Sequence, residues 1–176
     1  MKVDLTDILS VANKEITKKV PVEMVSFDSK LGSFPITKKE DVVLHILNEE
    51  NKRLLIRGST ELTIAIPCDR CLEDVETTLR LDIDKEIPIH VEEQEVDEEE
   101  MEKADYMIGF HLDLDRIIYD EVLVNWPMKV LCREDCAGIC KKCGQNLNHK
   151  TCDCEKTELD PRMAVIQDVF NKFKEV

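Results

Sequence analysis

Residues 61–84 read ELTIAIPCDRCLEDVETTLRLDID, and the architecture of the chain can be worked out from this stretch. Apolar and polar residues alternate over 61–66 and again over 75–84, on either side of a Cys-x-x-Cys pair. Such alternation indicates half-buried β-strands, because successive side chains of a strand point to opposite faces of the sheet. The stretch therefore predicts two antiparallel strands with Cys68 and Cys71 in the turn between them.

The segments ahead of this hairpin are also strand-like. Residues 42–47 and 54–56, joined across Asn48-Glu49-Glu50-Asn51, suggest another hairpin. After the second strand, Ile87, Ile89 and Val91 keep its parity, so one long bent strand and two short strands are both open. The first 20 residues are ambiguous. Leu5, Ile8 and Leu9 could start a short helix, while residues 20–25 look extended.

The apolar period changes in the second half of the chain. Leu114, Ile117, Ile118, Val122 and Trp126 recur at spacings of three and four, which predicts an amphipathic helix that ends at Pro127. A second helix is expected from Asp160-Pro161, a plausible N-cap and first helical residue, with Met163, Ile166, Phe170 and Phe173 on one face. We expect an α+β protein, with an antiparallel β-sheet in the N-terminal half and two helices with a zinc-knuckle segment in the C-terminal half.

The charge of the chain is concentrated in a short stretch. The 176 residues carry a net charge of −14, and residues 92–105 contain nine acids and one base. This stretch has no apolar period and reads as a linker between a β-rich half, 1–91, and a helical and metal-binding half, 106–176, which pack together as one domain. The linker is either a plain connection or an acidic lure for a basic partner.

Composition also bears on the compartment. The sequence contains no apolar run near the ~20 residues that a membrane crossing needs. Its start, MKVDLTD, carries acids where a secretory signal would be basic and then apolar. A cytoplasmic location is expected. Cytosolic thiols stay reduced, so the eight cysteines indicate metal ligands or redox groups rather than disulfides.

The last four cysteines have the spacing of a closed metal site. Cys140, Cys143, Cys152 and Cys154 fall within fifteen residues, and Gly144 permits the left-handed turn that a zinc knuckle often needs. The single residue between Cys152 and Cys154 makes binding by both sulfurs geometrically tight. His149 is the obvious substitute ligand for this site.

The other four cysteines suggest a second site. Cys68 and Cys71 with Cys132 and Cys136 would place one metal between distant segments and pin the helical half onto the sheet. Free buried thiols, a redox Cys-x-x-Cys, or ligands exchanged between the two sets are the alternatives. Zinc is the expected metal, two ions in all, although an iron–sulfur cluster needs the same thiolates in either set.

The sequence carries no enzyme signature that we recognise. Phosphate-binding glycine loops, nucleophile elbows and the His-Glu-x-x-His zinc motif are missing, and four thiolates leave no open position on a metal. Residues 129–150 have a net charge of +3, which either compensates thiolate charge or offers a small face to RNA phosphates. The candidate RNA contacts are Lys129, Arg133, Lys141, Lys142 and Lys150.

The cysteine motifs resemble those of a known family. Cys68-Asp69-Arg70-Cys71-Leu72, Cys132 with Cys136, and the run Gly138-Ile139-Cys140-x-x-Cys143-Gly144-x-Asn146-Leu147-Asn148, followed by Cys152-x-Cys154 and Asp160-Pro161-Arg162, are similar to the YceD family. These are the bacterial large ribosomal RNA subunit accumulation proteins. The resemblance covers nearly the whole chain and implies a role in accumulation of large-subunit ribosomal RNA. It implies a process and no reaction.

The sequence thus predicts a non-enzymatic ribosome-assembly factor with structural zinc, which supports accumulation or processing of large-subunit ribosomal RNA. Its expected partner is a basic ribosomal protein or an rRNA-processing factor on the assembling large subunit, with weak direct contact to RNA and none to a membrane. Two other functions stay open. One is a thiol redox or regulatory protein acting through Cys68 and Cys71, and the other is a zinc-stabilised interaction module unrelated to ribosomes.

Overall fold

The computed structural model describes residues 1–89 and 106–154. They form two compact units, one of residues 1–69, 73–89 and 106–134, the other of residues 70–72 and 135–154. The acidic linker expected over 92–105 and the helix expected from Asp160 lie outside the described residues. None of the helices in the described ranges has the length and apolar character that a bilayer crossing requires.

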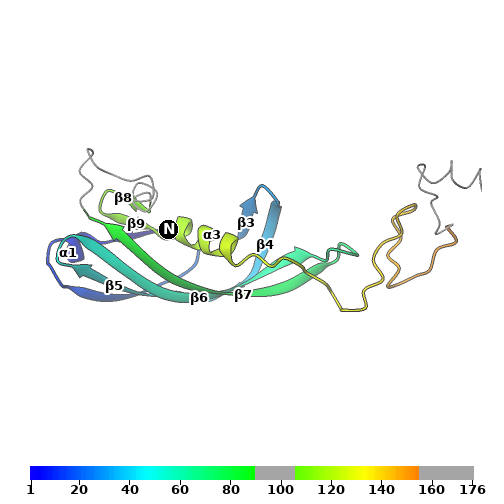
Figure 1. Cartoon of the computed structure of the whole chain (residues 1–176), viewed down its shortest axis with the longest axis horizontal. Helices are drawn as coiled ribbons and strands as arrows, with labels where there is room; N and C mark the ends of the chain where they lie inside the picture. Colours follow the sequence, from blue (N-terminus) through cyan, green and yellow to red (C-terminus); the bar gives the residue numbers. More distant parts are fainter. Residues whose placement is uncertain (90–105, 155–176) are drawn as a thin grey trace, which may run out of the picture. The chain divides into compact units, whose positions relative to one another are not determined.

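The first unit is built around the hairpin of β6 (Arg53–Pro67) and β7 (Asp74–Pro88) (Figure 1). The strands pair without a break from Arg53↔Pro88 to Pro67↔Asp74. The predicted hairpin is confirmed and is longer than the alternation alone indicated. The strands expected over 54–56 and 61–66 are one strand. β7 reaches Pro88 and so includes Ile87 but not Ile89, while Val91 lies outside the described residues.

The second edge of β6 is shared by two strands. β5 (Val42–Glu49) pairs with the first part of β6 in the expected hairpin, and β4 (Gly32–Lys39) pairs with the last part. β2 (Glu15–Val20) extends the sheet beside β5, and β3 (Ser26–Ser29) extends it beside β4. All pairings of this six-stranded sheet are antiparallel, as predicted.

The central place of β6 corrects one detail of the prediction. Thr63 and Ala65 were expected on a solvent-facing side of a half-buried strand, but only 6% and 9% of their surface is exposed. Here β6 lies between β4 and β7, and Thr63 Oγ1 lies 3.1 Å from Thr78 Oγ1 on β7. Residues 62–66 are all buried, so both faces of this part of the strand are covered.

Three short strands form a separate small sheet. β1 (Lys2–Asp4) pairs with β9 (His111–Asp113), which also pairs with β8 (Met107–Ile108). The short helix suggested near the start is present as α1 (Thr6–Leu9), whereas residues 21–25, expected to be extended, carry no regular strand. The helical half thus begins with the β8–β9 hairpin, and β9 pairs with the first residues of the chain.

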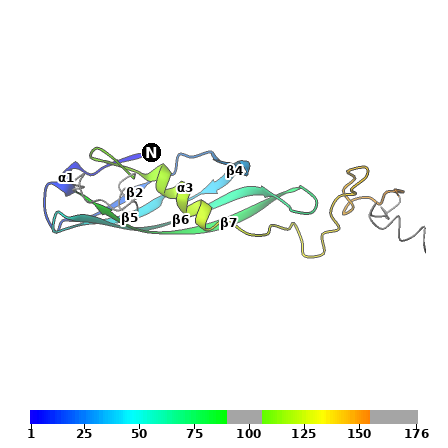
Figure 2. The same ribbon diagram turned by 45° about the horizontal axis from the view of Figure 1, so that its top comes forward.

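The predicted amphipathic helix is α3 (Leu114–Val124), which covers one face of the β6–β7 hairpin (Figure 2). Asp113 caps it by accepting a hydrogen bond from the Arg116 backbone N–H at 3.4 Å. The helix ends at Val124, before Trp126, whose ring packs on Phe27 and Phe34 with centroids 5.3 and 4.9 Å apart. These rings join the segment after α3 to β3 and β4.

The core lies between the six-stranded sheet, α3, α1 and the small sheet. Its largest fully buried side chains are Leu5, Ile8, Phe27, Leu44, Ile46, Leu54, Ile56, Leu62, Ile64, Leu81, Ile87 and Leu112. Burying one such side chain contributes roughly 1.5–3 kcal/mol. This core fixes the end of the hairpin and the segment after α3, and both carry cysteines.

Candidate metal centres

Cys68, Cys71, Cys132 and Cys136 come together although the two pairs are distant in the sequence. We call them the first cluster. Cys68 and Cys71 lie in the turn between β6 and β7, and Cys132 and Cys136 lie in the segment after α3. The four sulfur atoms lie within 4.8 Å of one another. Three of these side chains are buried and Cys132 is exposed.

Backbone hydrogen bonds shape the turn that carries Cys68. The Cys68 N–H donates to the Glu73 carbonyl at 2.8 Å, and Leu72 takes a left-handed φ of 62° to close the turn. The turn also binds the segment that leaves α3. The Asp69 N–H donates to the Val130 carbonyl at 2.9 Å, and the Val130 N–H donates to Asp69 Oδ2 at 2.8 Å. These two hydrogen bonds hold Val130, two residues before Cys132, against the turn that carries Cys68.

Cys140, Cys143, Cys152 and Cys154 form the second cluster. Their sulfurs also lie within 4.8 Å of one another, so the single residue between the last two cysteines does not keep them apart. The Gly144 N–H donates to the Cys140 carbonyl at 2.8 Å, and Gly144 has a φ of 74°, the left-handed turn expected of a knuckle. His149, the substitute ligand considered from the sequence, is not a member of this group of four.

Hydrogen bonds shift the pKa values of the thiols in the second cluster in opposite directions. Backbone N–H groups of Cys143 and Lys142 donate to Cys140 and lower the pKa of its thiol to about 6. A hydrogen bond to Cys143, together with burial, raises the pKa of the Cys154 thiol to about 12. One sulfur is thus a ready thiolate while another holds a proton. A metal ion that bound all four sulfurs would displace that proton.

Both clusters could hold a metal ion. Four sulfurs at ~2.3 Å from a tetrahedral zinc ion lie ~3.8 Å from one another, close to the grouping seen here. A set of four thiolates suits Zn²⁺ and iron–sulfur clusters alike. It fills a tetrahedral ion completely, which is the arrangement of structural rather than catalytic zinc.

The second unit is a compact ribbon folded onto residues 70–72. The Ile139 N–H donates to the Arg70 carbonyl at 3.0 Å, and Arg70 Nη1 donates to the Cys136 carbonyl at 2.9 Å. Gly138, with a φ of 77°, lies so close that an added Cβ would be 3.0 Å from the Arg70 oxygen. In the sequence, Gly138 and Asn148 stand out only as parts of a motif. In the folded chain Gly138 lets the ribbon approach Arg70, and Asn148 forms hydrogen bonds with Ala137 and Cys136.

The five candidate RNA contacts do not form part of either group of sulfurs. All five are solvent-exposed: Lys129, Arg133, Lys141, Lys142 and Lys150. The ribbon around the second cluster therefore carries three of these cations on its surface. Their exposure is compatible with contacts to phosphates and equally with compensation of thiolate charge.

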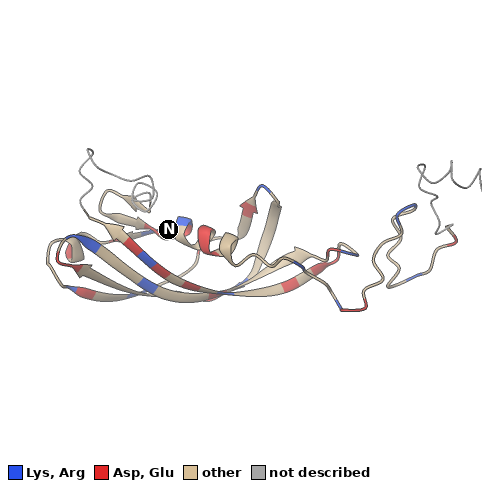
Figure 3. Ribbon diagram, in the orientation of Figure 1, with Lys and Arg blue, Asp and Glu red and all other residues tan. Residues whose placement is uncertain are grey.

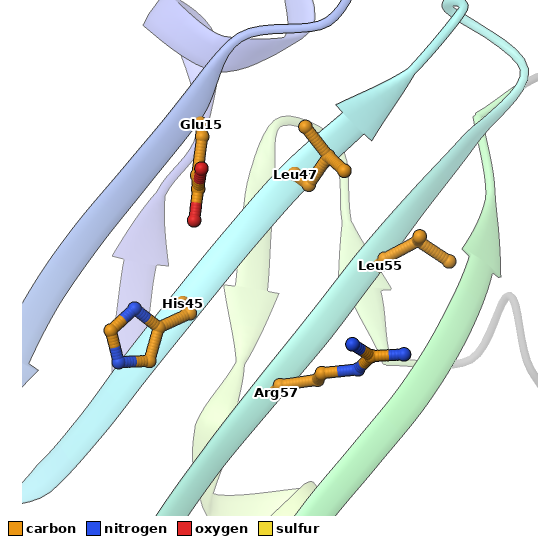
Figure 4. A pocket seen from close by; sticks show the side chains of 5 residues that line it. All are labelled: Glu15, His45, Leu47, Leu55 and Arg57. Atoms are coloured by element: carbon orange, nitrogen blue, oxygen red, sulfur yellow. The ribbon is translucent and has the colours of Figure 1, made fainter.

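A shallow pocket of about 130 Å³ lies on the exposed face of the six-stranded sheet (Figure 4). Its lining consists of Glu15, His45, Leu47, Leu55 and Arg57. Arg57 already pairs with Asp84 of β7 at 3.5 Å, and Arg53 pairs with Glu86 at 3.2 Å. Acidic and basic positions are spread over β6 and β7 (Figure 3). Across residues 1–89 and 106–154, groups of side chains with metal-ligating geometry occur only in the two cysteine clusters.

Curated relatives share parts of this chain. An uncharacterized protein of Mycobacterium leprae is 27% identical over 94 residues, which cover 53% of this chain and 43% of the relative. An uncharacterized protein of Mycobacterium bovis is 25% identical over 119 residues, 66% of this chain and 56% of the relative. Each alignment thus spans about half of the relative's own length. No solved structure matches the chain.

Two further comparisons concern ribosomal RNA. A chloroplastic Arabidopsis thaliana protein named large ribosomal RNA subunit accumulation protein YCED homolog 1 is 39% identical over 49 residues, 28% of this chain and 15% of the relative. The family model described as large ribosomal RNA subunit accumulation protein YceD matches residues 56–170, a span that contains all eight cysteines. The chain belongs to the YceD family of large ribosomal RNA subunit accumulation proteins.

Proposed function

We propose that this chain is a non-enzymatic assembly factor of the large ribosomal subunit, built around two structural zinc ions. Family membership supports the process, accumulation or processing of large-subunit ribosomal RNA. The observation that carries the molecular part is the convergence of eight cysteines into two sets of four. Sets of four thiolates leave a zinc ion no open position for water or substrate, so the metal serves the fold.

The first zinc ion would be bound by Cys68, Cys71, Cys132 and Cys136, the second by Cys140, Cys143, Cys152 and Cys154. The burial of Cys68 and Cys71, 0% and 4% exposed, supports a structural role over thiol redox chemistry, which needs an accessible sulfur. An alkylating reagent should therefore leave both thiols unmodified while metal is bound. Rapid alkylation of the metal-loaded protein at Cys68 or Cys71 would favour the redox function instead.

The charge of the chain points to a protein partner. With a net charge of −14, the chain as a whole repels RNA, whereas ribosomal proteins and processing factors offer basic surfaces. The factor docks on such a basic protein of the assembling large subunit in the cytoplasm. Weak direct contact with RNA runs through Lys129, Arg133, Lys141, Lys142 and Lys150.

The acidic stretch from 92 to 105 is the proposed contact for that partner. Deleting Glu95 to Glu102 removes six acids in eight residues. The deletion should weaken binding to the basic partner and leave zinc content unchanged. Unaltered partner binding after this deletion would move the docking surface elsewhere on the chain.

The process itself is tested by depletion. Loss of the protein should lower free and assembled large subunits on a sucrose gradient and reduce large-subunit ribosomal RNA relative to small-subunit RNA. Wild-type protein should restore the profile, and a Cys71→Ser variant should not. A normal profile after complete depletion would contradict the ribosomal role and leave a zinc-stabilised module of another process.

A further inference from the structure

The side chain of Asn148 links the two cysteine clusters. By sequence it belongs to the loop between Cys143 and Cys152 of the second cluster. Its amide Nδ2, however, donates to the sulfur of Cys136, a member of the first cluster, at 3.3 Å. Its Oδ1 accepts the Ala137 N–H at 2.8 Å. Because the oxygen is taken by Ala137, the amide N–H₂ group faces the Cys136 sulfur.

The loop holds Asn148 in this position. The Asn148 N–H donates to Asn146 Oδ1 at 2.9 Å, and the Leu147 N–H donates to the Gly138 carbonyl at 2.9 Å. Ile139 and Asn146 form an isolated antiparallel bridge within the same ribbon. The loop that presents Asn148 is therefore closed at both ends by ligands of the second cluster and braced along its length.

The chemistry of a thiolate explains what this bond does. A sulfur bound to zinc in a site of four thiolates keeps much of its negative charge, since the site carries a net charge of −2. An N–H donor that faces such a sulfur stabilises it and fixes its direction. Outer partners of metal ligands typically change metal affinity by 10–100-fold when they are removed.

We infer that Asn148 is a positioning residue that couples the two metal centres. When the second cluster binds its ion, the loop is ordered and the Asn148 amide is aimed at Cys136, which strengthens metal binding at the first cluster. By thermodynamic linkage the first ion strengthens binding of the second by the same factor. The inference rests on the metal binding proposed above. It gives the loop between Cys143 and Cys152 a role in the first centre as well as in the second.

The test is an Asn148→Asp variant loaded with cadmium in place of zinc. The substitution keeps the shape and the oxygen that accepts from Ala137 but replaces the sulfur-facing donor by a carboxylate oxygen. Lys150→Gln is the matched control, because it also changes the net charge by −1 in the same loop, at an exposed residue. NMR of bound cadmium reports each centre separately, and a Cys143→Ser variant identifies the resonance of the second.

Asn148→Asp should shift the resonance of the first centre and weaken its metal affinity ~10–100-fold in chelator competition. The second resonance should stay in place, and Lys150→Gln should match the wild type. Asn148→Ala, which adds no charge, should act in the same direction, so a folding defect of the aspartate variant would not decide the result. In Cys143→Ser protein the first centre should already be weak, and adding Asn148→Asp should cost little more.

The possible results distinguish a failure of the coupling from a failure of the proposed metal binding. Two bound ions in the wild type, with an unchanged first centre in both Asn148 variants, would overturn the coupling alone. Wild-type protein that binds no cadmium or zinc would overturn the metal centres and the coupling with them. A first centre that is as strong in Cys143→Ser as in the wild type would also overturn the coupling.

Discussion

Gly58 has no room for a side chain in the centre of β6. A Cβ atom at this position would lie 2.6 Å from the Val43 carbonyl oxygen and 2.9 Å from Leu44 Cδ2 on β5. We expect Gly58→Ala to lower the free energy of unfolding by about 1–3 kcal/mol, since the backbone oxygen cannot move aside without disturbing the ladder. Denaturant unfolding followed by circular dichroism measures the change.

The neighbouring position provides the control for this prediction. Ser59 pairs with Val43 in the same ladder but is exposed, so Ser59→Ala should change the free energy of unfolding by less than about 0.5 kcal/mol. Equal effects of the two substitutions would mean that β5 and β6 are not packed as tightly as the structure has them.

A largely buried ion pair holds α3 on β7. Lys85 Nζ lies 2.7 Å from Glu121 Oε1, and their side chains are 24% and 11% exposed. Lys85→Met should destabilise the protein by about 3 kcal/mol, because it leaves the Glu121 carboxylate buried without its partner. Thermal unfolding should show a clear loss, and the double variant Lys85→Met, Glu121→Gln should recover much of it.

An exposed pair of similar length serves as the reference. Lys38 Nζ lies 2.9 Å from Glu76 Oε2, but these side chains are 70% and 55% exposed. Lys38→Met should therefore cost less than about 1 kcal/mol. A cost for Lys38→Met as large as that for Lys85→Met would refute the role given to burial.

The phenol of Tyr106, which donates a hydrogen bond to Asp120 of α3, makes the stability of the protein depend on pH. Burial, and then its hydrogen bond to Asp120 at 2.7 Å, raise the pKa of Tyr106 to about 12. The folded state thus holds this proton more tightly than the unfolded state, so its contribution to stability is full below pH ~10 and is lost as the pH rises toward 12. Ultraviolet titration should show one phenol ionising near pH 12, and Tyr106→Phe should remove that transition. Ionisation of both tyrosines near pH 10 would contradict it.

The elements differ in how far the sequence could predict them. Alternation in 75–84 and the helical period from Leu114 were sufficient for β7 and α3, because each buries one face along its own length. β8 and β9 could not be predicted, since they have only two and three residues and depend on pairing with each other and, for β9, with the distant β1. Lys85, on the apolar face of its strand, was the unused sign that α3 would supply a partner.

The cysteine clusters could also be predicted only in part from the sequence. Spacing alone suggested two sets of four cysteines, and local turns such as that at Gly144 follow from residue type. The contacts of Asp69 with Val130 and of Asn148 with Cys136 were not predictable, because each joins residues through the folded chain and neither residue type identifies its partner.

For the whole molecule, the two clusters should differ in their effect on stability. Cys71 is 4% exposed in a cluster whose ligands come from distant segments, whereas the second cluster closes a single short loop. Structural zinc binds with an apparent free energy of ~10–16 kcal/mol, comparable to the total stability of a domain. Cys71→Ser should therefore reduce hydrogen-exchange protection throughout β6, β7 and α3, while Cys143→Ser should affect mainly residues 140–154.

Elemental analysis accompanies that comparison. Protein purified without chelator should contain close to two zinc equivalents, and each serine variant should contain about one, apart from the coupling argued for Asn148. Iron in the purified protein, together with absorbance in the visible range, would indicate an iron–sulfur cluster in place of zinc. Equal global destabilisation by both variants, or none by Cys71→Ser, would show that the cysteines are grouped differently.

The net charge of the molecule limits how it can serve ribosomal RNA. Five exposed cations in 129–150 can neutralise at most about five phosphates, so the logarithm of affinity for single-stranded RNA should fall with the logarithm of salt at a slope no steeper than about −3.5. We expect weak, salt-sensitive binding to bare RNA in filter assays, and firm binding to the assembling particle.

Replacing Lys141 and Lys142 by Glu should weaken particle binding without loss of zinc. The same exchange at Lys38 and Lys39 on β4 should matter less, because these residues lie outside the basic segment. Tight, salt-resistant binding to bare RNA would require a recognition surface other than these charges.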